Sequence, residues 1–378
     1  MDLGTHLAVL AGPTVPLPLP QPIAARLLGV AVRETDDARS AFTLTFDAAR
    51  SGPADLLDVP LFAFPPLLSG SRVSVVVSVN GIPQVLVDGF VTRIEHSPAT
   101  GSGESRITIT GEDASWLLDR EEVTRELPMD DYPQVLMLLA PYAARGIVPM
   151  AIPPLDMDPP LPVIRVPQQR ATDLAHLQEL AGRHGYVTYA IPGPAPGMSS
   201  MYWGPQVRLG VPQRAITIGQ LPSTNVVGDV QFTLDAHGPV EVRGRDRDRT
   251  TGVELPIRTT PPLRVPLSAL PLAVLRAGDT RVRLATESGS SVVGTLMRAQ
   301  AEVDRAADAV TASGTLDGAR YGGVLRPRGL VGLRGAGWAH DGLWYVRSVE
   351  HTWARGSWTQ AFTLARDGYG STVPAVIA

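Results

Sequence analysis

The sequence contains no cysteine and no lysine, and each absence limits what the chain can do. Without cysteine, the 378 residues hold no disulfide framework, no thiolate metal site and no cysteine nucleophile, which fits a reducing cytosol. All 33 basic residues are therefore arginine. We attribute this bias to a GC-rich genome, although arginine also suits multi-donor contacts at interfaces. The formal net charge of −4 gives no electrostatic case for nucleic acid or an anionic membrane.

Long apolar runs are also missing. No stretch approaches the ~18 consecutive apolar residues of a membrane span. The apolar segment at residues 7–20 is no signal peptide, because no basic residue precedes it and prolines interrupt it. We therefore expect no membrane anchor, and the charge balance predicts no sequence-specific binding of nucleic acid.

The composition indicates a folded, loop-rich chain. Hydrophobic residues make up 44% and charged residues 19%, and there are 37 glycines and 35 prolines. This composition favours many short strands joined by turns over a helical bundle, and the length suggests two or three domains. Alternating apolar residues in "LLGVAVRET" and "SAFTLTFDA" predict strands, and Asn80-Gly81 predicts a hairpin turn.

Two stretches far apart in the chain resemble each other. "FVTRIEHSPATGSGESRITI" at Phe90–Ile109 aligns without a gap on "YVRSVEHTWARGSWTQAFTL" at Tyr345–Leu364, with seven identical and five similar positions among twenty. Each copy predicts a strand, a loop and a return strand. The shared residues of interest are a Glu-His pair at the strand end and a glycine in the loop: Glu95, His96, Gly101, Glu350, His351 and Gly356.

The repeat predicts one β-unit used twice. Each copy places an aromatic residue and two or three aliphatic residues on one side of its strands, as the core of a sheet or small barrel requires. We therefore expect a mainly β fold with two similar small β-barrel domains and an α+β insertion. The expected boundaries are residues 1–112 for the first barrel, completed by about 205–235, 113–204 for the insertion, and 236–378 for the second barrel, with a helix near 296–309.

Several polar clusters are candidates for chemical sites. His96 and His351 could be ligands or bases, but a catalytic pair is rarely duplicated in equivalent places, so we expect hydrogen-bonded edge or interface residues. The carboxylates at residues 112–122 could serve a glycosidase, but they fall on a predicted helix as solvated or capping charges. The nucleophile-elbow, P-loop and dinucleotide glycine patterns are missing. We predict no enzyme activity, no catalytic residue, no metal and no cofactor.

Four ordered stretches carry a resemblance to a known family. They are "VDGFVTRIEHS" followed by "RITITGEDASWLLDR", "ATDLAHLQELAGRHGYVTYA", "RAQAEVDRAADAVTASGTLDGARYGGVLRPRGLVGLRG" and "DGLWYVRSVEHTWARGSWTQAFTLARD". Together they resemble the baseplate hub proteins of contractile tails, namely the phage late control gene D proteins and the hub half of type VI VgrG proteins. The resemblance covers residues 25–367.

The resemblance implies a structural role and a set of partners. The hub fold implies a homotrimer that adapts the six-fold tail tube protein to a three-fold central spike, next to baseplate wedge or sheath-proximal proteins. VgrG proteins continue into a spike, and no such segment follows residue 378, so a separate spike protein is expected. The particle, a phage or a phage-tail-like injection system, would be assembled in the bacterial cytoplasm. The alternatives are a tail-associated peptidoglycan hydrolase and a tail-tip adaptor of a non-contractile tail.

Overall fold

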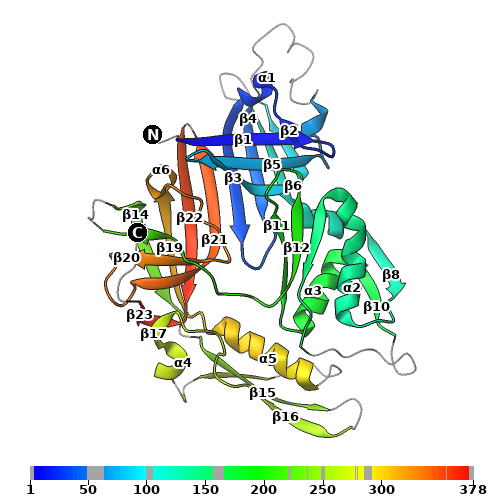
Figure 1. Cartoon of the computed structure of the whole chain (residues 1–378), viewed down its shortest axis with the longest axis vertical. Helices are drawn as coiled ribbons and strands as arrows, with labels where there is room; N and C mark the ends of the chain where they lie inside the picture. The colour runs from blue at the N-terminus through cyan, green and yellow to red at the C-terminus, as the bar shows by residue number, and fades with distance from the viewer. Residues whose placement is uncertain are drawn as a thin grey trace.

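A computed structural model describes most of the chain. The described residues are 4–48, 64–98, 105–155, 166–219, 223–235, 237–247, 252–276, 278, 280–284, 292–354 and 356–373. Figure 1 shows an elongated molecule built around one large sheet, with an α+β insertion beside it and a helix and a hairpin below it. Among the described residues, no helix is both long and apolar enough to cross a membrane.

Within the described residues, the large sheet has thirteen strands. They are β1 Thr5–Gly12, β2 Leu17–Pro18, β3 Leu27–Thr35, β4 Ala41–Asp47, β5 Arg72–Val79, β6 Ile82–Ser97, β7 Arg106–Asp113, β13 Gln213–Thr217, β14 Val226–Leu234, β19 Val310–Asp317, β20 Leu330–Arg334, β21 Gly342–Ala354 and β22 Ser357–Arg366. The main path runs β14-β19-β22-β21-β3-β4-β7-β6-β5-β1-β2, with β20 and β13 branching from β21. The alternation in β4 illustrates its origin, because Phe42, Leu44 and Phe46 are buried while Thr43 and Thr45 are half-buried.

This sheet contains the same five-stranded arrangement twice. In the first unit, strands β3, β4, β5, β6 and β7 pair in the order β3-β4-β7-β6-β5. In the second unit, β14, β19, β20, β21 and β22 follow one another in the same chain order and pair as β14-β19-β22-β21-β20. A short helical turn separates the second and third strands of each unit: η2 Pro65–Leu67 in the first and α6 Gly318–Tyr321 in the second.

Each unit bends its sheet over its own core. In Figure 1, β1 and β5 run across β3 and β22 near the top of the molecule, and β20 runs crosswise at about mid-height on the left. One core cluster joins Val73, Val75 and Val77 of β5 to Phe42 and Leu44 of β4. The second cluster joins strands β19, β20, β21 and β22. Each core therefore lies against a bent part of the open sheet.

The α+β insertion follows the first unit and has its own core. It comprises η3 Ala114–Asp119, β8 Glu122–Glu126, α2 Asp131–Leu139, η4 Ala140–Arg145, β9 Ile147–Ala151, β10 Gln168–Thr172, α3 Asp173–Arg183, β11 Val187–Pro192 and β12 Ser199–Gly204. Helices α2 and α3 pack on the three-stranded sheet β11-β12-β9 through Leu138, Leu177 and Trp203. The hydroxyl of Thr172 accepts a hydrogen bond from the Ala175 amide and caps α3. A separate apolar core allows the insertion to hold its shape beside the large sheet.

A second insertion lies between the first two strands of the second unit. It contains β15 Val240–Arg247, β16 Glu254–Arg258, β17 Ser268–Pro271, α4 Leu272–Leu275, β18 Arg281–Leu284 and α5 Val292–Ala306. Helix α5 covers most of the range 296–309, where the sequence predicts a helix, and it packs on β15 through Ala299 and Val303. The last strand, β23 Gly368–Ser371, pairs with β17.

The structure corrects two expectations about the domains. The described strands of the large sheet form an open sheet, and the two predicted barrels are not closed within the chain. Residues 213–234 do not complete the first unit, because β13 pairs with β20 and β14 pairs with β19 of the second unit. Sequence alternation identifies strands but not their partners, and both errors concern partners. The mainly β character itself is confirmed.

Candidate assembly surface

The two units share a backbone irregularity at equivalent positions. The β6–β7 ladder shifts register between Val91 and Arg93, and the β21–β22 ladder shifts between Val346 and Ser348, which are the aligned positions. Val91 donates to the Ser71 carbonyl and accepts from the Gly70 amide, and Val346 makes the same two bonds with residues 329 and 328. A β-bulge at the same place in both copies shows that the repeated sequence specifies the same local strand geometry.

The segment that precedes the third strand is also equivalent. Gly70 and Arg328 both have positive φ, at 82° and 66°, three residues after the buried leucines Leu67 and Leu325. Positive φ is rare outside glycine, so its recurrence at Arg328 indicates a backbone shape that the second unit retains without glycine. The gap-free alignment of the sequence misses this segment, because the two stretches share little beyond the leucine.

The return strands slide by two residues relative to the sequence alignment. Ile94 lies opposite Ile109, whereas the equivalent Val349 lies opposite Phe362 rather than Leu364. The structural counterpart of Ile109 is therefore Phe362. A slide of two residues keeps the same side chains on the core face, so apolar periodicity cannot detect it.

The two cores fill equivalent places with different side chains. In the first unit Leu44 lies opposite Ile109, and in the second Gly314 lies opposite Phe362. A Cβ built on Gly314 would lie 2.8 Å from the Phe362 ring. The second unit thus pairs a large residue with glycine where the first pairs two aliphatic residues, and the absent side chain of Gly314 leaves room for the Phe362 ring.

The predicted repeat residues have different surroundings in the two units. Glu95 and His96 are exposed near the end of β6, whereas His351 on β21 is fully buried and only its neighbour Glu350 is exposed. Gly356 has φ of 82° in the turn between β21 and β22, where glycine is favoured. Gly101 lies outside the described residues.

His351 lies among charged and aromatic side chains where the two units meet. Its Nε2 atom is 3.6 Å from Oε1 of Glu34, and its ring stacks on Trp353 and Trp358 at 5.9 and 6.3 Å between centroids. Burial lowers the pKa of His351, against the opposing effect of Glu34. Burial alone would raise the pKa of Glu34, but Arg326 and His351 outweigh burial and hold that pKa below its usual value. The neutral imidazole and the ionised carboxylate are therefore the favoured forms.

Arg326 and a strand pair join the two units. Strand β3 of the first unit pairs with β21 of the second from Gly29↔Ala354 to Thr35↔Ser348. Arg326 crosses this junction and donates to Glu34 Oε1 and Oε2 at 2.9 and 3.0 Å, and also to the carbonyls of residues 85 and 86. Buried charges need such complete pairing, because desolvation is costly. The sequence gives no signal for this cluster, whose members come from three distant segments.

A second polar cluster attaches the α+β insertion to the first unit. The buried carboxylate of Asp88 accepts from Arg72, from Ser74 Oγ at 2.6 Å, and from the amide of Gly197 and the hydroxyl of Ser199 at 3.1 and 2.8 Å. This cluster was also missed, although an Asp-Gly pair in the middle of a strand, as at residues 88–89, is a usable signal for a special position.

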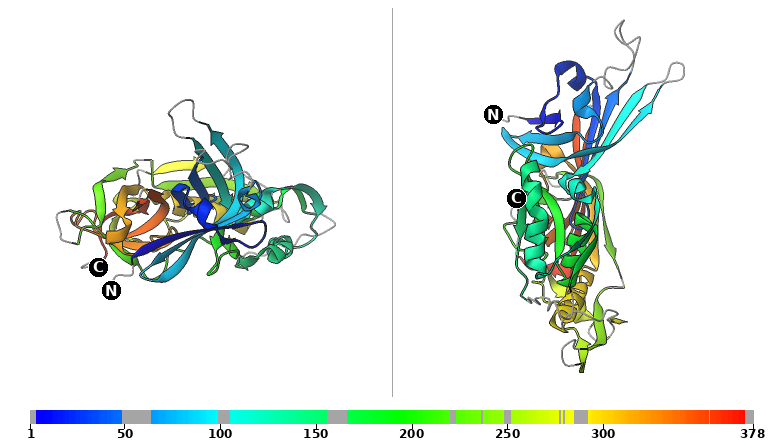
Figure 2. Two further views of the ribbon diagram at one scale, coloured as in Figure 1. Left: turned by 90° about the horizontal axis from the view of Figure 1, so that it is seen from above. Right: turned by 90° about the vertical axis from the view of Figure 1, so that its right-hand side faces the viewer.

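One face of the large sheet is polar and is not packed against the insertion. Figure 2 shows the α+β insertion lying toward one face only. The other face carries half-buried threonines from both units: Thr43, Thr45, Thr108, Thr110, Thr311, Thr315, Thr359 and Thr363. Arg33, Glu350, Ser313 and their neighbours line a shallow depression on it. This face thus presents hydroxyl groups together with charged groups such as Arg33, Asp229 and Glu350.

The described residues do not assemble a metal site. No group of three or more His, Asp or Glu side chains among them is placed to hold a metal ion. The carboxylates of Glu34 and Asp88 both accept hydrogen bonds from protein donors. The arrangement offers strand edges and a broad polar sheet face, which are features of assembly through β-sheets.

Comparison with known proteins shows what this fold is similar to. No family model matches the sequence, and no curated protein matches it. Among solved structures, the chain is similar to a tail protein from Neisseria meningitidis, with a TM-score of 0.63 and 15% identity over 96% of this chain and 97% of that chain.

Two further structures share the fold. One is a 43 kDa prophage tail protein from Shewanella oneidensis, with a TM-score of 0.64 and 13% identity over 96% and 99% of the two chains. The other is an Escherichia coli component of the type VI secretion system, itself described as similar to bacteriophage T4 tail proteins, with a TM-score of 0.53 and 13% identity over 93% and 77%. At these identities the likeness establishes a shared fold, and the fold of this chain is that of tail proteins.

Proposed function

We propose that this protein is a structural hub of a phage tail or a phage-tail-like injection particle. The observation that carries the proposal is the duplicated five-stranded unit within one sheet. The fold shared with phage tail proteins and a type VI secretion component supports it. The predicted absence of enzyme activity belongs to the same proposal, as does assembly inside the bacterial cell.

The proposed mechanism is symmetry matching. Three chains, each with two equivalent units, place six similar units around one axis, which suits contact with a six-fold tube on one side and a three-fold spike on the other. In this arrangement the open sheets would close into a barrel only between chains. The threonine-rich face would then line the central channel. The partners proposed are a second and third copy of this chain, a tail tube protein, a separate spike protein and the surrounding baseplate wedge or sheath-proximal proteins.

The oligomeric state tests the proposal. Sedimentation and native mass measurement of the purified chain, alone and mixed with its tail tube and spike proteins, should give a species of three 40.2 kDa chains. A chain that stays monomeric at every concentration, with both partner proteins present, would contradict the hub role. A zymogram on purified cell wall complements this test, and clearing by the intact chain would instead support the peptidoglycan hydrolase alternative.

A further inference from the structure

The β3–β21 pairing joins the two units within one chain, and it indicates how the units of two different chains would pair. Strand β3 pairs with one side of β21, opposite the side that holds β22. The register places His351 opposite Val32 and Glu350 opposite Arg33. Because the two units are equivalent, the counterpart of β21 is β6 and the counterpart of β3 is β14.

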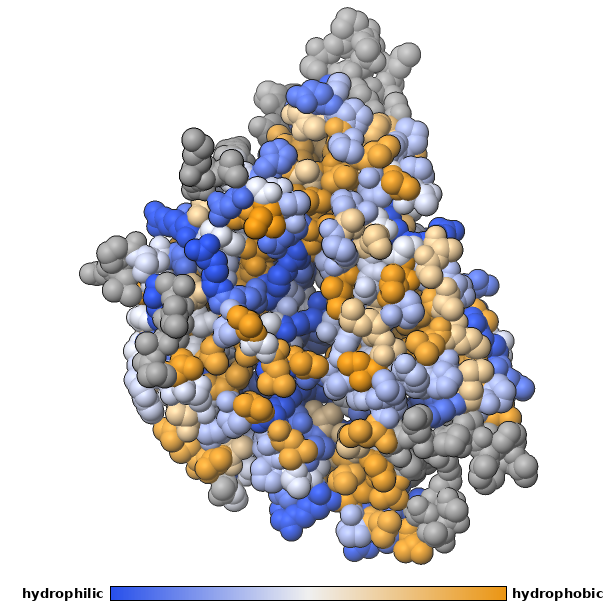
Figure 3. All heavy atoms as spheres, viewed as in Figure 1, coloured by the Kyte–Doolittle hydropathy of each residue, from blue (hydrophilic) through white to orange (hydrophobic). Residues whose placement is uncertain are grey.

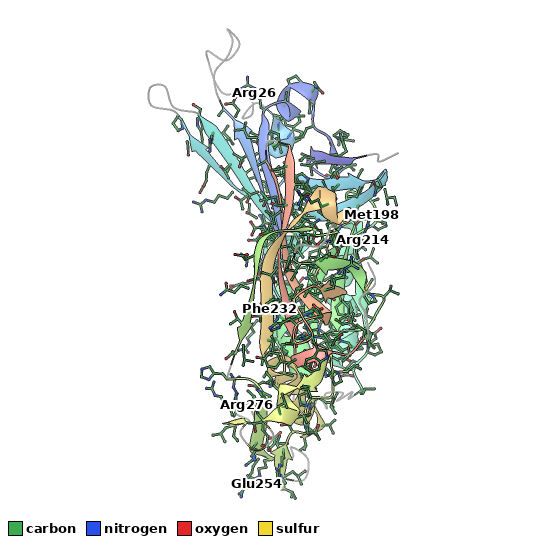
Figure 4. The ribbon with its side chains drawn as sticks, turned by 90° about the vertical axis from the view of Figure 1, so that its left-hand side faces the viewer. Arg26, Met198, Arg214, Phe232, Glu254 and Arg276 are labelled. Carbon is green, nitrogen blue, oxygen red and sulfur yellow. The ribbon has the colours of Figure 1, made fainter. Side chains whose placement is uncertain are left out.

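Both counterparts, β6 and β14, have an edge along which no described strand pairs. Strand β6 pairs with β5 only from Ile82 to Phe90, and beyond Val91 its β5 side has no described strand beside it. Among the described strands, β14 is the end of the sheet and pairs only with β19. Figure 4 views this side of the molecule and labels Phe232 on β14. Open edges are templates for pairing with another chain.

We propose that β14 of a neighbouring copy pairs antiparallel with the outer half of β6, in the register of the β3–β21 junction. The β4–β3 and β19–β14 ladders make Phe232 the counterpart of Val32. The register then sets His96 opposite the neighbour's Phe232, and Glu95 opposite its Thr233. The inference deepens the proposed trimer and rests on it.

The face of each side chain agrees with this register. Phe232 and Leu234 lie on the core side of β14, and Ile94 and His96 lie on the core side of β6, so Leu234 comes opposite Ile94 and Phe232 comes opposite the His96 imidazole. On the other face Arg93 comes opposite Asp235, and both are exposed in the single chain. A register shifted by one residue would put the apolar side chains of one strand against the polar face of the other.

The residue that the first unit carries at the position equivalent to Arg326 also supports pairing of β6 with β14. Counting from the positive-φ residues Gly70 and Arg328, the counterpart of Arg326 is Leu68, and the counterpart of Glu34 is Leu234. The ion pair that joins the units inside the chain is therefore replaced by two leucines, which are 39% and 46% exposed. Two exposed leucines at matching places are explained if they pack together between chains.

The proposed contact is head-to-tail, because each chain carries one β6 edge and one β14 edge. Such a contact generates either a closed ring or an open filament, and three chains with a two-unit repeat close with six quasi-equivalent junctions. Three of those junctions are present within the chains. The other three are the ones proposed.

Cysteine cross-linking tests the register directly, because the chain has no cysteine of its own. The double variant Glu95→Cys/Thr233→Cys should form disulfides between chains under mild oxidation and give covalent oligomers up to three chains. The control Glu95→Cys/Val227→Cys, six residues out of register, should give much less. Equal cross-linking of both variants, or no cross-linking of either in a preparation that sediments as a trimer, would overturn this interface and leave the proposed trimer standing. A chain that remains monomeric with its partners present overturns both.

Charged substitutions test the proposed contact between Leu68 and the neighbour's Leu234. Leu234→Glu should weaken self-association by at least about tenfold, because it buries a charge at the junction. The double variant Leu68→Arg/Leu234→Glu recreates the pair that joins the units inside the chain and should recover most of the lost affinity. Leu284→Glu, at a 75% exposed leucine on β18, is the matched control and should leave association unchanged. Thermal melting of each variant separates weakened assembly from misfolding, and a double variant no better than the single would contradict the contact.

Discussion

The two units share a topology but differ in their surroundings. The bulge, the positive-φ position and the buried leucine before the third strand recur in both. Yet His351 is enclosed by the neighbouring unit, whereas His96 is exposed. The repeated residues therefore specify the shape of a hairpin, and the neighbour decides whether the same side chain is buried. Figure 3 shows hydrophobic and hydrophilic residues interspersed on the face that it views.

Among equivalent positions of the two units, we expect substitution at Arg326 to give the largest difference in the free energy of unfolding. Arg326→Met leaves the buried Glu34 carboxylate without its partner and should lower the free energy of unfolding by roughly 3–5 kcal/mol. Chemical denaturation followed by circular dichroism measures this change. Leu68→Ala, at the equivalent exposed position of the first unit, should change the stability of the single chain by less than about 1 kcal/mol. Similar losses at both positions would show that the units are joined differently from this account.

A core exchange tests whether the two interiors are equivalent. Gly314→Leu alone should destabilise by about 1–3 kcal/mol, because the new side chain overlaps the Phe362 ring. Adding Phe362→Ile reproduces the Leu44 and Ile109 pair of the first unit and should restore most of the loss. Denaturation of the two single variants and the double variant gives the coupling energy. Additive losses would mean that the two positions are not equivalent to those of the first unit.

The pH dependence of stability should distinguish the two histidines. The lowered pKa of His351 means that the unfolded chain takes up this proton first on acidification, so stability falls as pH drops below about 6.5. Glu34, also with a lowered pKa, adds a loss only below about 4.5. Burial also lowers the pKa of His176 and of His340, so the part due to His351 is the difference in slope between the variant and the parent chain. His351→Gln should reduce the slope between about pH 6.5 and 5, by at most about 1.4 kcal/mol per pH unit. His96→Gln is the control at the exposed counterpart, and an equal change in both variants would contradict the assignment.

Local features of the fold could be predicted from the sequence, and pairings over long distances could not. Alternation located β3 at residues 27–35, and Asn80-Gly81 forms the turn between β5 and β6 with φ of 51° and 82°. The repeat was visible because its Glu-His strand end is retained. The two-residue shift of the return strand was not visible in the sequence, because a shift by two residues keeps each side chain on the same face of the sheet.

The site was predictable only in part for a related physical reason. The repeat residues mark the two hairpins, but the residues that join the units are Glu34 and Arg326, which lie outside the aligned stretches. Their counterparts Leu234 and Leu68 share neither charge nor size with them, so no sequence comparison within the chain would align them. Only the backbone equivalence of the two units relates these positions.

The most direct test of this account is a three-dimensional reconstruction of the assembled oligomer by electron cryomicroscopy. We expect a ring of three chains in which Val91 and Val346 lie at nearly the same radius and alternate around the axis at roughly 60° intervals, the spacing of six quasi-equivalent units. A ring in which the two hairpins lie at clearly different radii or heights, or an oligomer in which β6 and β14 of adjacent chains are not neighbours, would contradict it.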